Sequence, residues 1–190
     1  MVKKNTTSNT KTEKSSNNPL YPWYGTVASL DGLEQGDFVF SCPILEPEFD
    51  SNKNEVTATY AEYNVVILSQ SCDLVNNKLQ NVLVCPFWEL INMEAEYSWF
   101  KSKKNKEKLR RGTQPNYHLL NACDIPKFQF SHIIVDFRDV FSVPIEYMKQ
   151  YARSEKKRLR LLPPYKEHLA QAFARFFMRD GLPIDIRPFD

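Results

Sequence analysis

The sequence predicts an α+β protein with a mostly antiparallel sheet, and two kinds of pattern support this class. Short apolar runs bounded by turn residues predict strands, most clearly at Val65–Leu68 and Val82–Phe87. Apolar residues recur at helical spacing within residues 88–111 and from Tyr165 to Arg179. With 190 residues and 42% hydrophobic side chains, the chain is long enough for one sizeable core.

The first 18 residues differ in composition from the rest of the chain. They are rich in Lys, Thr, Ser and Asn and contain almost no apolar residue, so we expect a disordered polar tail. Residues 19–190 are expected to form a single globular domain. The tail holds four lysines and one glutamate, so the overall net charge of +2 leaves this domain near −1. Any nucleic-acid surface on the domain would therefore be a local patch.

Sheet or barrel strands are expected in residues 33–87 and 117–141. The first strand begins at Phe38 and is expected to end at Pro43. Glu46–Asn54 is acidic and polar and predicts a loop, whereas Glu55–Glu62 alternates apolar and polar residues as a half-exposed strand does. The continuous apolar run Val65–Leu68 is typical of a strand that is buried on both faces.

Helices are expected in three places. Residues 88–111 predict a helical insertion with glutamates toward its start and lysines toward its end, an order that suits the helix dipole. A short helix is expected through Met148 and Tyr151. Pro163 and Pro164 open a last helix over residues 163–180, because proline is favoured in the first turn.

The sharpest polar cluster, Ser69–Asp73, directly follows the central strand. A nucleophilic role for a serine or for Cys72 needs a base within hydrogen-bond reach, and the three histidines are all remote in sequence. In the alternative, Ser69, Ser71 and Asp73 bond backbone amides in a turn. We favour this second interpretation, because these residue types do so routinely.

Two basic segments are candidate phosphate contacts. The candidate nucleic-acid-binding residues are Lys101, Lys103, Lys104, Lys106, Lys108, Arg110, Arg111, Lys156, Lys157 and Arg158. For the first segment a solvated helix end is the favoured interpretation, since lysine spacing alone sets no geometry.

The last helix carries three aromatic residues within one turn, Phe173, Phe176 and Phe177. Phe176 and Phe177 point about 100° apart on a helix, so two of its faces need to be covered. The helix is therefore expected either to dock extensively inside the protein or to form a protein interface, with a second copy of the chain (a homodimer) as one candidate partner.

The four cysteines, Cys42, Cys72, Cys85 and Cys123, form no CxxC pair. Buried free thiols are therefore expected, with a zinc site as a minor alternative, and no metal or cofactor is predicted. We find no signal peptide and no run of about 18 apolar residues, which predicts a cytoplasmic protein without a membrane span.

The order of several strands carries a resemblance to a known family. Gly36–Phe40, Asn64–Ser69 and Val82–Pro86, followed by Ile133–Arg138 and a short helix, resemble the strand order of MazF/PemK-type toxins. The resemblance covers roughly residues 33–150 and implies a small curved β-barrel and the cleavage of RNA.

The chain departs from the pattern of this family at two places. Tyr63 and Asn64 stand where the family typically has an arginine and a proline, and Phe87 and Trp88 stand where it favours a hydroxyl residue. Asp136 and Arg138 can stand in for the acid and the arginine of the last barrel strand, although their spacing differs.

These observations support one leading hypothesis and two alternatives. The leading hypothesis is a non-catalytic binding or adaptor module of a prokaryotic toxin–antitoxin or phage-defence system, which holds a protein or nucleic-acid partner. The first alternative is a divergent endoribonuclease with Arg138 as phosphate clamp, Asp136 as acid or base, and Ser69 or Asp73 nearby. The second is a protein that depends on Cys72 or is stabilised by zinc.

Overall fold

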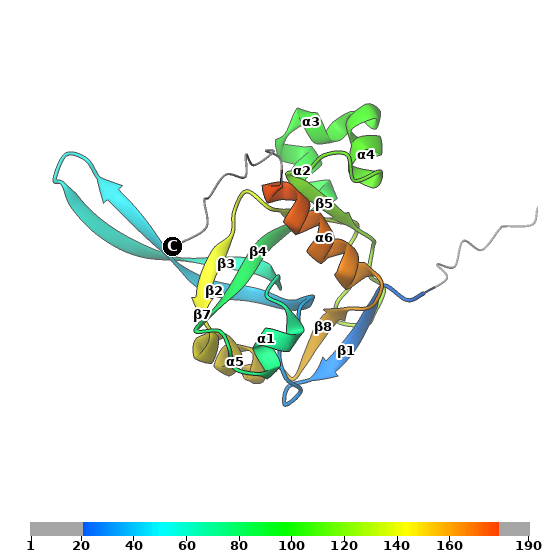
Figure 1. Cartoon of the computed structure of the whole chain (residues 1–190). Coiled ribbons are helices and arrows are strands. Elements are labelled where there is room, and N and C mark those ends of the chain that lie inside the picture. Colours follow the sequence, from blue (N-terminus) through cyan, green and yellow to red (C-terminus); the bar gives the residue numbers. More distant parts are fainter. Residues whose placement is uncertain (1–20, 179–190) are drawn as a thin grey trace, which may run out of the picture.

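The computed structural model describes residues 21–178 (Figure 1). Every strand pairing within this range is antiparallel. The elements are β1 (Tyr24–Ala28), β2 (Asp37–Asp50), β3 (Glu55–Ile67), α1 (Ser71–Val75), β4 (Asn81–Glu89), α2 (Leu90–Glu96), α3 (Ser98–Lys101), α4 (Lys103–Arg110), β5 (Tyr117–Leu120), β6 (Ile133–Asp136), β7 (Phe141–Pro144), α5 (Ile145–Ser154), β8 (Lys157–Leu161) and α6 (Tyr165–Phe177).

The strands form one eight-stranded sheet in the order β1-β8-β2-β3-β4-β6-β5, with β7 pairing to β4 beside this path. The predicted α+β class is thus confirmed. The two end strands of this order, β1 and β5, do not pair with each other in the part of the chain that the structure describes, so barrel closure stays a prediction. The predicted tail, residues 1–18, lies outside the described residues.

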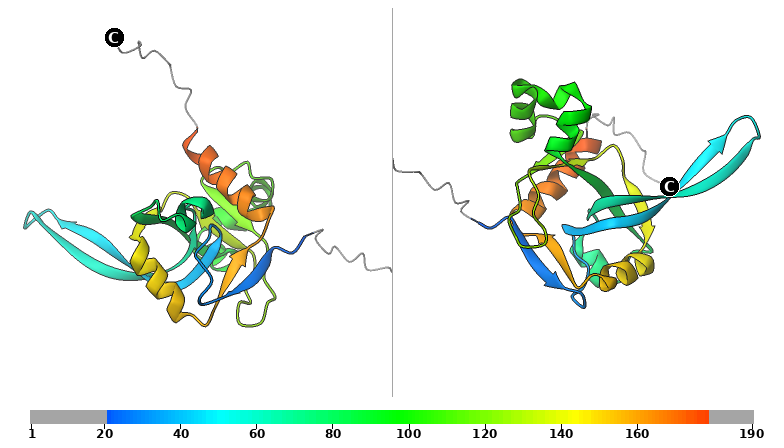
Figure 2. Two further views of the ribbon diagram at one scale, coloured as in Figure 1. Left: turned by 60° about the horizontal axis from the view of Figure 1, so that its bottom comes forward. Right: turned by 180° about the vertical axis from the view of Figure 1, so that it is seen from behind.

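Both faces of the sheet are buried at the central strand, which explains its continuous apolar run. Val65 and Ile67 belong to one core cluster, which Met148 of α5 also joins, whereas Val66 and Leu68 belong to a second cluster, which contains Leu169 of α6. The two helices are on different sides of the curved sheet (Figure 2). The strand prediction for Val65–Leu68, buried on both faces, is therefore confirmed.

The β2 and β3 strands are much longer than predicted and project from the body as an arm (Figures 1 and 2). The predicted loop at Glu46–Asn54 is wrong, because β2 continues to Asp50 and only residues 51–54 form the turn. Pro43 and Pro47 do not end β2. In the arm β2 pairs only with β3, and its other edge is free. The N–H groups that the two prolines lack would lie on this free edge, so no hydrogen bond between the strands is lost.

A β-bulge fixes the base of this arm. The register shifts between Val39 and Cys42, and Ser41 has a φ of 46°, in the left-handed region that few non-glycine residues adopt. The Tyr151 hydroxyl of α5 donates to the carbonyl oxygens of Phe40 (3.2 Å) and Ser41 (2.6 Å). The α5 helix therefore holds the bulge in place.

The predicted helical insertion consists of three short helices rather than one, and residues 88 and 89 still belong to β4. The helices are interrupted at Tyr97 and Ser102, which have extended backbone angles. These breaks allow Met93, Phe100 and Leu109, one from each helix, to reach a common third core cluster with Ile134.

The strand predicted over residues 128–141 is also divided. Only Ile133–Asp136 and Phe141–Pro144 form strands, and Phe130 makes an isolated bridge with Cys123. Conversely, the basic segment after α5 contains an unpredicted strand, β8, which pairs with β1 and β2. No helix within residues 21–178 is both long enough and apolar enough to cross a membrane.

A buried ionic network joins β8 to β2. The Asp37 side chain is fully buried between the guanidinium groups of Arg158, at 3.5 Å, and Arg160, which binds both of its carboxylate oxygens. Arg158 is 1% exposed and donates mainly to backbone carbonyl groups. These acceptors are the carbonyl oxygens of Ala28, Ser29, Asp31, Gly32 and Ala152. The predicted phosphate contact by Arg158 is therefore wrong, because its guanidinium is enclosed.

Gly36, which directly precedes Asp37, also helps to join β8 to its neighbours. Its φ of +85° favours glycine, and a Cβ atom there would lie 3.1 Å from the Cβ of Leu161. The Gly36 amide donates to the Ile67 carbonyl, and the Leu161 amide donates to the Gly36 carbonyl. The turn before Asp37 thus connects β3 with β8.

We predict that Asp37→Asn lowers the free energy of unfolding by about 3–5 kcal/mol, because it leaves two guanidinium groups without their buried counter-charge. Urea denaturation monitored by circular dichroism measures this change. Glu34→Gln is the matched control, since Glu34 also binds Arg160 but is 33% exposed, and we expect a loss of about 1 kcal/mol or less. Equal losses in the two variants would contradict the assigned role of burial.

Candidate functional site: an aromatic cleft beside Asp136 and Arg138

A cleft of about 550 Å³ lies where the helices α2 and α3 meet the strands β4, β5 and β6. Its volume falls within the range of small-molecule sites. Its aromatic lining residues are Trp88, Tyr97, Trp99, Phe100 and Tyr117, and its polar ones are Asn92, Glu96, Asp136, Arg138 and Asp139. The lining therefore combines aromatic faces with three carboxylates and one cation.

The aromatic residues of the cleft support one another from two elements. Phe100 of α3 is buried and contacts Trp99 and Tyr117 edge-to-face, with ring centroids 4.9 Å and 5.3 Å away. Trp99 and Tyr117 are 6.0 Å apart. Trp88 and Tyr97 are 38% and 53% exposed, so their surfaces remain accessible.

Asp136 and Arg138 lie together in this cleft as a bidentate ion pair. Arg138 Nε donates to Asp136 Oδ1 at 2.9 Å, and Arg138 Nη2 donates to Oδ2 at 2.7 Å. The Arg138 amide also donates to Oδ1 at 3.0 Å. The Asp136 side chain is 4% exposed and that of Arg138 is 52% exposed. The guanidinium carbon lies 4.8 Å from the centroid of the Tyr117 ring, which fixes its position further.

The charge of the cleft is negative. Glu96, Asp136 and Asp139 face a single cation, Arg138, among the lining residues. The hydrogen bonds from Asp136 raise the pKa of Arg138, so the guanidinium stays charged. Burial, followed by the charge of Asp136, raises the pKa of both Asp139 and Tyr117.

This arrangement suits binding better than catalysis. Aromatic faces beside carboxylates attract a cationic group, and flat rings also accept planar groups by stacking. Histidine, cysteine, serine and threonine are absent from the residues that line this cleft within the described range. The usual pairing of a hydroxyl or thiol nucleophile with a histidine base therefore has no counterpart here.

Ser69 and Asp73, the other two candidate catalytic residues, do not line this cleft. The Ser69 hydroxyl accepts a hydrogen bond from the Leu83 amide at 2.9 Å, and the Ser71 hydroxyl accepts one from the Gln35 amide at 3.1 Å. Asp73 is in α1 and pairs with Lys78 at 3.8 Å. The predicted bonding of Ser69 and Ser71 to backbone amides is confirmed. The predicted turn is wrong for residues 71–73, because Ser71–Val75 forms the helix α1 and Asp73 pairs with Lys78.

The first basic segment forms α4 and the residues beside it. Glu107 accepts hydrogen bonds from both Arg110 and Arg111, which lower the pKa of this carboxyl to about 2. Lys106 pairs with Glu94 at 2.6 Å. The remaining members of the predicted set are exposed, namely Lys101, Lys103, Lys104 and Lys108. The segment is a solvated surface in which only part of the positive charge is compensated.

The second basic segment does not form one surface with the first. Lys156 and Lys157 are exposed where β8 begins, whereas Arg158 is enclosed as described above. Figure 1 shows the start of β8 and the α4 helix at opposite ends of the body. A single nucleic-acid track through both segments is therefore not supported.

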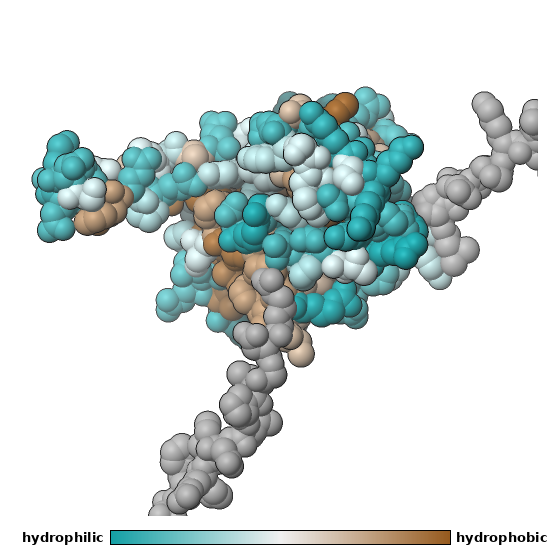
Figure 3. Space-filling view, turned by 90° about the horizontal axis from the view of Figure 1, so that it is seen from above, coloured by the Kyte–Doolittle hydropathy of each residue, from teal (hydrophilic) through white to brown (hydrophobic). Residues whose placement is uncertain are grey.

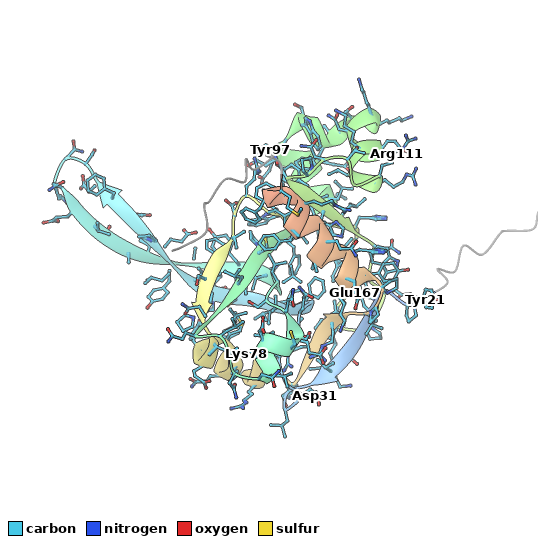
Figure 4. All side chains as sticks on the ribbon, in the orientation of Figure 1. Tyr21, Asp31, Lys78, Tyr97, Arg111 and Glu167 are labelled. Atoms are coloured by element: carbon cyan, nitrogen blue, oxygen red, sulfur yellow. The ribbon has the colours of Figure 1, made fainter. Side chains whose placement is uncertain are left out.

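Arg110 and Arg111 instead line a second, basic cleft with residues of β5 and α6. This cleft has a volume of about 370 Å³ and also contains His118, His168 and Arg175. Burial lowers the pKa of His118 to about 4, and the charges of His168 and Arg175 act in the same direction. Figure 4 shows Arg111 and Tyr97 on two different sides of the helical insertion, and the basic cleft and the aromatic cleft have no lining residue in common.

The three phenylalanines of α6 divide between the core and the surface. Phe173 and Phe176 pack against Phe137, with ring centroids 5.4 Å and 6.1 Å away. Phe177 is 63% exposed, and Figure 3 shows an apolar area beside the end of the described chain. The internal docking of α6 is thus observed for two residues, and the protein interface at Phe177 stays a prediction.

The cysteines give little support to cysteine or zinc chemistry. Cys42, Cys85 and Cys123 are buried, and burial raises the pKa of each thiol. Cys72 is exposed, so the expectation of a buried thiol is wrong for this residue. Among residues 21–178, no three His, Cys, Asp or Glu side chains are placed to share a metal ion.

The sequence analysis did not identify the aromatic wall of the first cleft. Trp88, Trp99 and Tyr117 come from three separate segments, and each is flanked by residues that predict ordinary packing. The one local signal in the sequence was the presence of aromatic residues, Tyr97 and Trp99, in a helical stretch rich in charge.

His118, which is partly buried, gives a testable pH dependence. The His118 pKa is about 4 in the folded protein, against about 6.5 in an unfolded chain. The unfolded state therefore binds more protons between these values, and stability is lost as the pH falls from about 6.5 toward 4. We predict that His118→Gln shows a smaller fall in the urea midpoint between about pH 7.5 and pH 4.5 than the unchanged protein does. His132→Gln, at an exposed site, is the control. The same fall in all three proteins would show that His118 is not the source of the pH dependence.

Comparison with known proteins gave no match to a protein-family model, to a curated protein or to a solved structure. The resemblance to MazF/PemK-type toxins therefore stays a prediction. The functional proposal below rests on the geometry of the described residues.

Proposed function

We propose that this protein is a non-catalytic binding module whose aromatic cleft holds a lysine or arginine side chain of a protein partner. The observation that carries the proposal is the ion pair of Asp136 and Arg138. The buried carboxylate engages two guanidinium nitrogens, at 2.9 Å and 2.7 Å, and so leaves an aromatic cleft with excess negative charge.

The same ion pair argues against phosphate recognition in this cleft. A phosphate group would have to displace a buried carboxylate from Arg138, and Asp136 would then lose its counter-charge. Glu96 and Asp139 would repel the incoming anion as well. A cation is attracted instead. The carboxylates of Glu96 and Asp139 attract it by their charge, and the aromatic faces of Trp88 and Tyr97 attract it as well.

The wider setting in the proposal comes from the resemblance to MazF/PemK-type toxins. We place the module in the cytoplasm of a prokaryote, in a toxin–antitoxin or phage-defence system, with its sheet forming a small curved barrel. The strand segments Gly36–Phe40, Asn64–Ser69 and Val82–Pro86 support this part of the proposal. The replacement of the family's arginine and proline by Tyr63 and Asn64 supports the non-catalytic role.

A titration followed by tryptophan fluorescence tests the cleft directly, since Trp88 and Trp99 both line it. We expect N-acetyl-arginine amide and N-acetyl-lysine amide to change the emission saturably, and N-acetyl-glutamine amide to have no effect. Tyr97→Ala and Asp139→Asn should each weaken binding roughly 5- to 10-fold, because each removes one attraction for the cation.

Tyr60→Ala is the matched control, because Tyr60 is also an exposed tyrosine but lies on the arm, away from the cleft. Binding of the neutral amide as tightly as the cations, or equal weakening in all three variants, would contradict the proposal. A pull-down with the tagged chain after nuclease treatment then tests for a protein partner, whose capture should decrease in Tyr97→Ala and Asp139→Asn.

A divergent endoribonuclease is the second candidate, and one observation favours it. Arg138 is half exposed at the edge of a cleft whose aromatic rings could stack on RNA bases. If this candidate is correct, the chain cleaves single-stranded RNA and Arg138→Ala lowers the rate by about 100-fold or more. Intact RNA after prolonged incubation with the unchanged protein would remove the candidate.

A further inference from the structure

The arm formed by β2 and β3 has two chemically different faces. We refer to residues 43–62 as the ribbon. Its register pairs Pro43 with Glu62 and continues to Asp50 opposite Glu55, without a shift. Because side chains alternate between faces along a strand, this register decides which residues share a face.

One face of the ribbon is apolar and open to solvent. The cross-strand pairs on this face join Leu45 to Tyr60, Pro47 to Ala58 and Phe49 to Val56. Leu45, Phe49, Val56 and Tyr60 are 55%, 64%, 70% and 77% exposed, and Pro47 and Ala58 are exposed too. Six adjacent side chains without a charge therefore form an uncovered strip.

The opposite face is acidic. It carries Glu46, Glu48 and Asp50 on β2, and Glu55, Thr57 and Thr59 on β3. The only cation of the turn, Lys53, pairs with Asp50 at 3.6 Å. Figure 3 shows the ribbon extending away from the body, so the body does not cover it.

We propose that two copies of this chain associate by packing the apolar faces of their ribbons against each other about a twofold axis. The first argument is area. Phe49 and Tyr60 each expose about 100–150 Å², since a large aromatic side chain buries about 150–250 Å² in total. With the four aliphatic residues, the strip offers on the order of 500 Å² per copy, or about 1,000 Å² for two copies, which reaches the lower limit of specific interfaces.

The second argument is the distribution of charge. When two sheets pack face to face they lie about 10 Å apart, and here both acidic faces would point outward. The carboxylates of the two copies would then be separated by more than the Debye length of about 8 Å at physiological ionic strength. Apart from Glu62, which lies opposite Pro43 at the base of the ribbon, association through the apolar faces brings no carboxylates together, and the strip from Leu45 to Tyr60 needs no oppositely charged partner.

The third argument excludes pairing through the β2 edge. Pro43 and Pro47 share the non-bonded side of β2, so two of the N–H groups that would face an added strand are missing. Pairing at an edge would also leave the apolar strip uncovered. Face-to-face packing covers it.

Sedimentation velocity from about 1 to about 200 µM tests this proposal on the full chain. We expect a reversible dimer whose dissociation constant lies in the micromolar range, as suits an interface of this size. Phe49→Glu and Tyr60→Glu should each weaken association by roughly 10-fold or more, because a charge would be buried without a partner.

Thr57→Glu and Thr59→Glu are matched controls, since they add the same charge at neighbouring positions on the acidic face. They should leave the dissociation constant within about twofold. At concentrations well below the dissociation constant, the denaturation midpoints of all four variants should lie close to that of the unchanged chain, since these side chains are exposed in the monomer.

A monomer throughout the concentration range would overturn the proposal, as would equal weakening by the two pairs of variants. Phe177→Glu separates the ribbon from α6. If this variant dissociates the dimer while Phe49→Glu and Tyr60→Glu do not, the interface belongs to α6 and the proposal fails. The cleft is separate from the ribbon, so failure here would leave the titration of the cleft unaffected.

Discussion

The fold depends on the burial of one carboxylate, Asp37, between two arginines of β8. Arg158 and Arg160 are two residues apart and therefore point to the same face of the strand, where the Asp37 carboxylate pairs with both. Arg158 also binds the carbonyl groups of the turn after β1, so this network fixes the register of β8 against both of its neighbours. The α6 helix follows β8 directly, and its position over the aromatic core is thus set by the same interaction.

The central part of the fold was predictable because its sequence signals are local. Val65–Leu68 and Val82–Phe87 are apolar on both faces, and a strand is the short element that buries such a run completely. The strand predicted at Glu55–Glu62 is confirmed as part of β3, but the β2 side of the ribbon was missed because it has no core to contact. Its alternation of Leu45, Pro47 and Phe49 with acidic residues is present in the sequence, but the prolines and carboxylates together are typical of a loop. The β8 strand was missed for a related reason, since its arginines are buried by bonds to distant carbonyl groups that a local pattern does not reveal.

The candidate site was predictable only in its polar pair. Asp136 ends the apolar strand β6 and Arg138 lies in the turn that follows, close enough for its amide and guanidinium to bind the carboxylate, and the sequence indicated this pair. The aromatic wall requires the helical breaks at Tyr97 and Ser102, and these breaks arise because Met93, Phe100 and Leu109 must reach Ile134. Tertiary packing of this kind overrides helix propensity and has no local signature. At Ser69 and Ser71 the bonding to backbone amides could be predicted, because short polar side chains do this in most contexts, although Ser71 begins the helix α1 rather than a turn.

The clamped bulge at the base of the ribbon has a mechanical consequence. The ribbon extends about 25 Å beyond Cys42, since each strand residue advances the chain by about 3.3 Å. A load applied near Phe49 acts on the body as a torque about the bulge. Hydrogen bonds from two tyrosine hydroxyls resist this torque. Tyr151 donates to the carbonyl oxygens of Phe40 and Ser41, and Tyr147 donates to that of Pro43. The α5 helix, which carries both tyrosines, is therefore the element through which the angle of the ribbon is transmitted to the rest of the molecule.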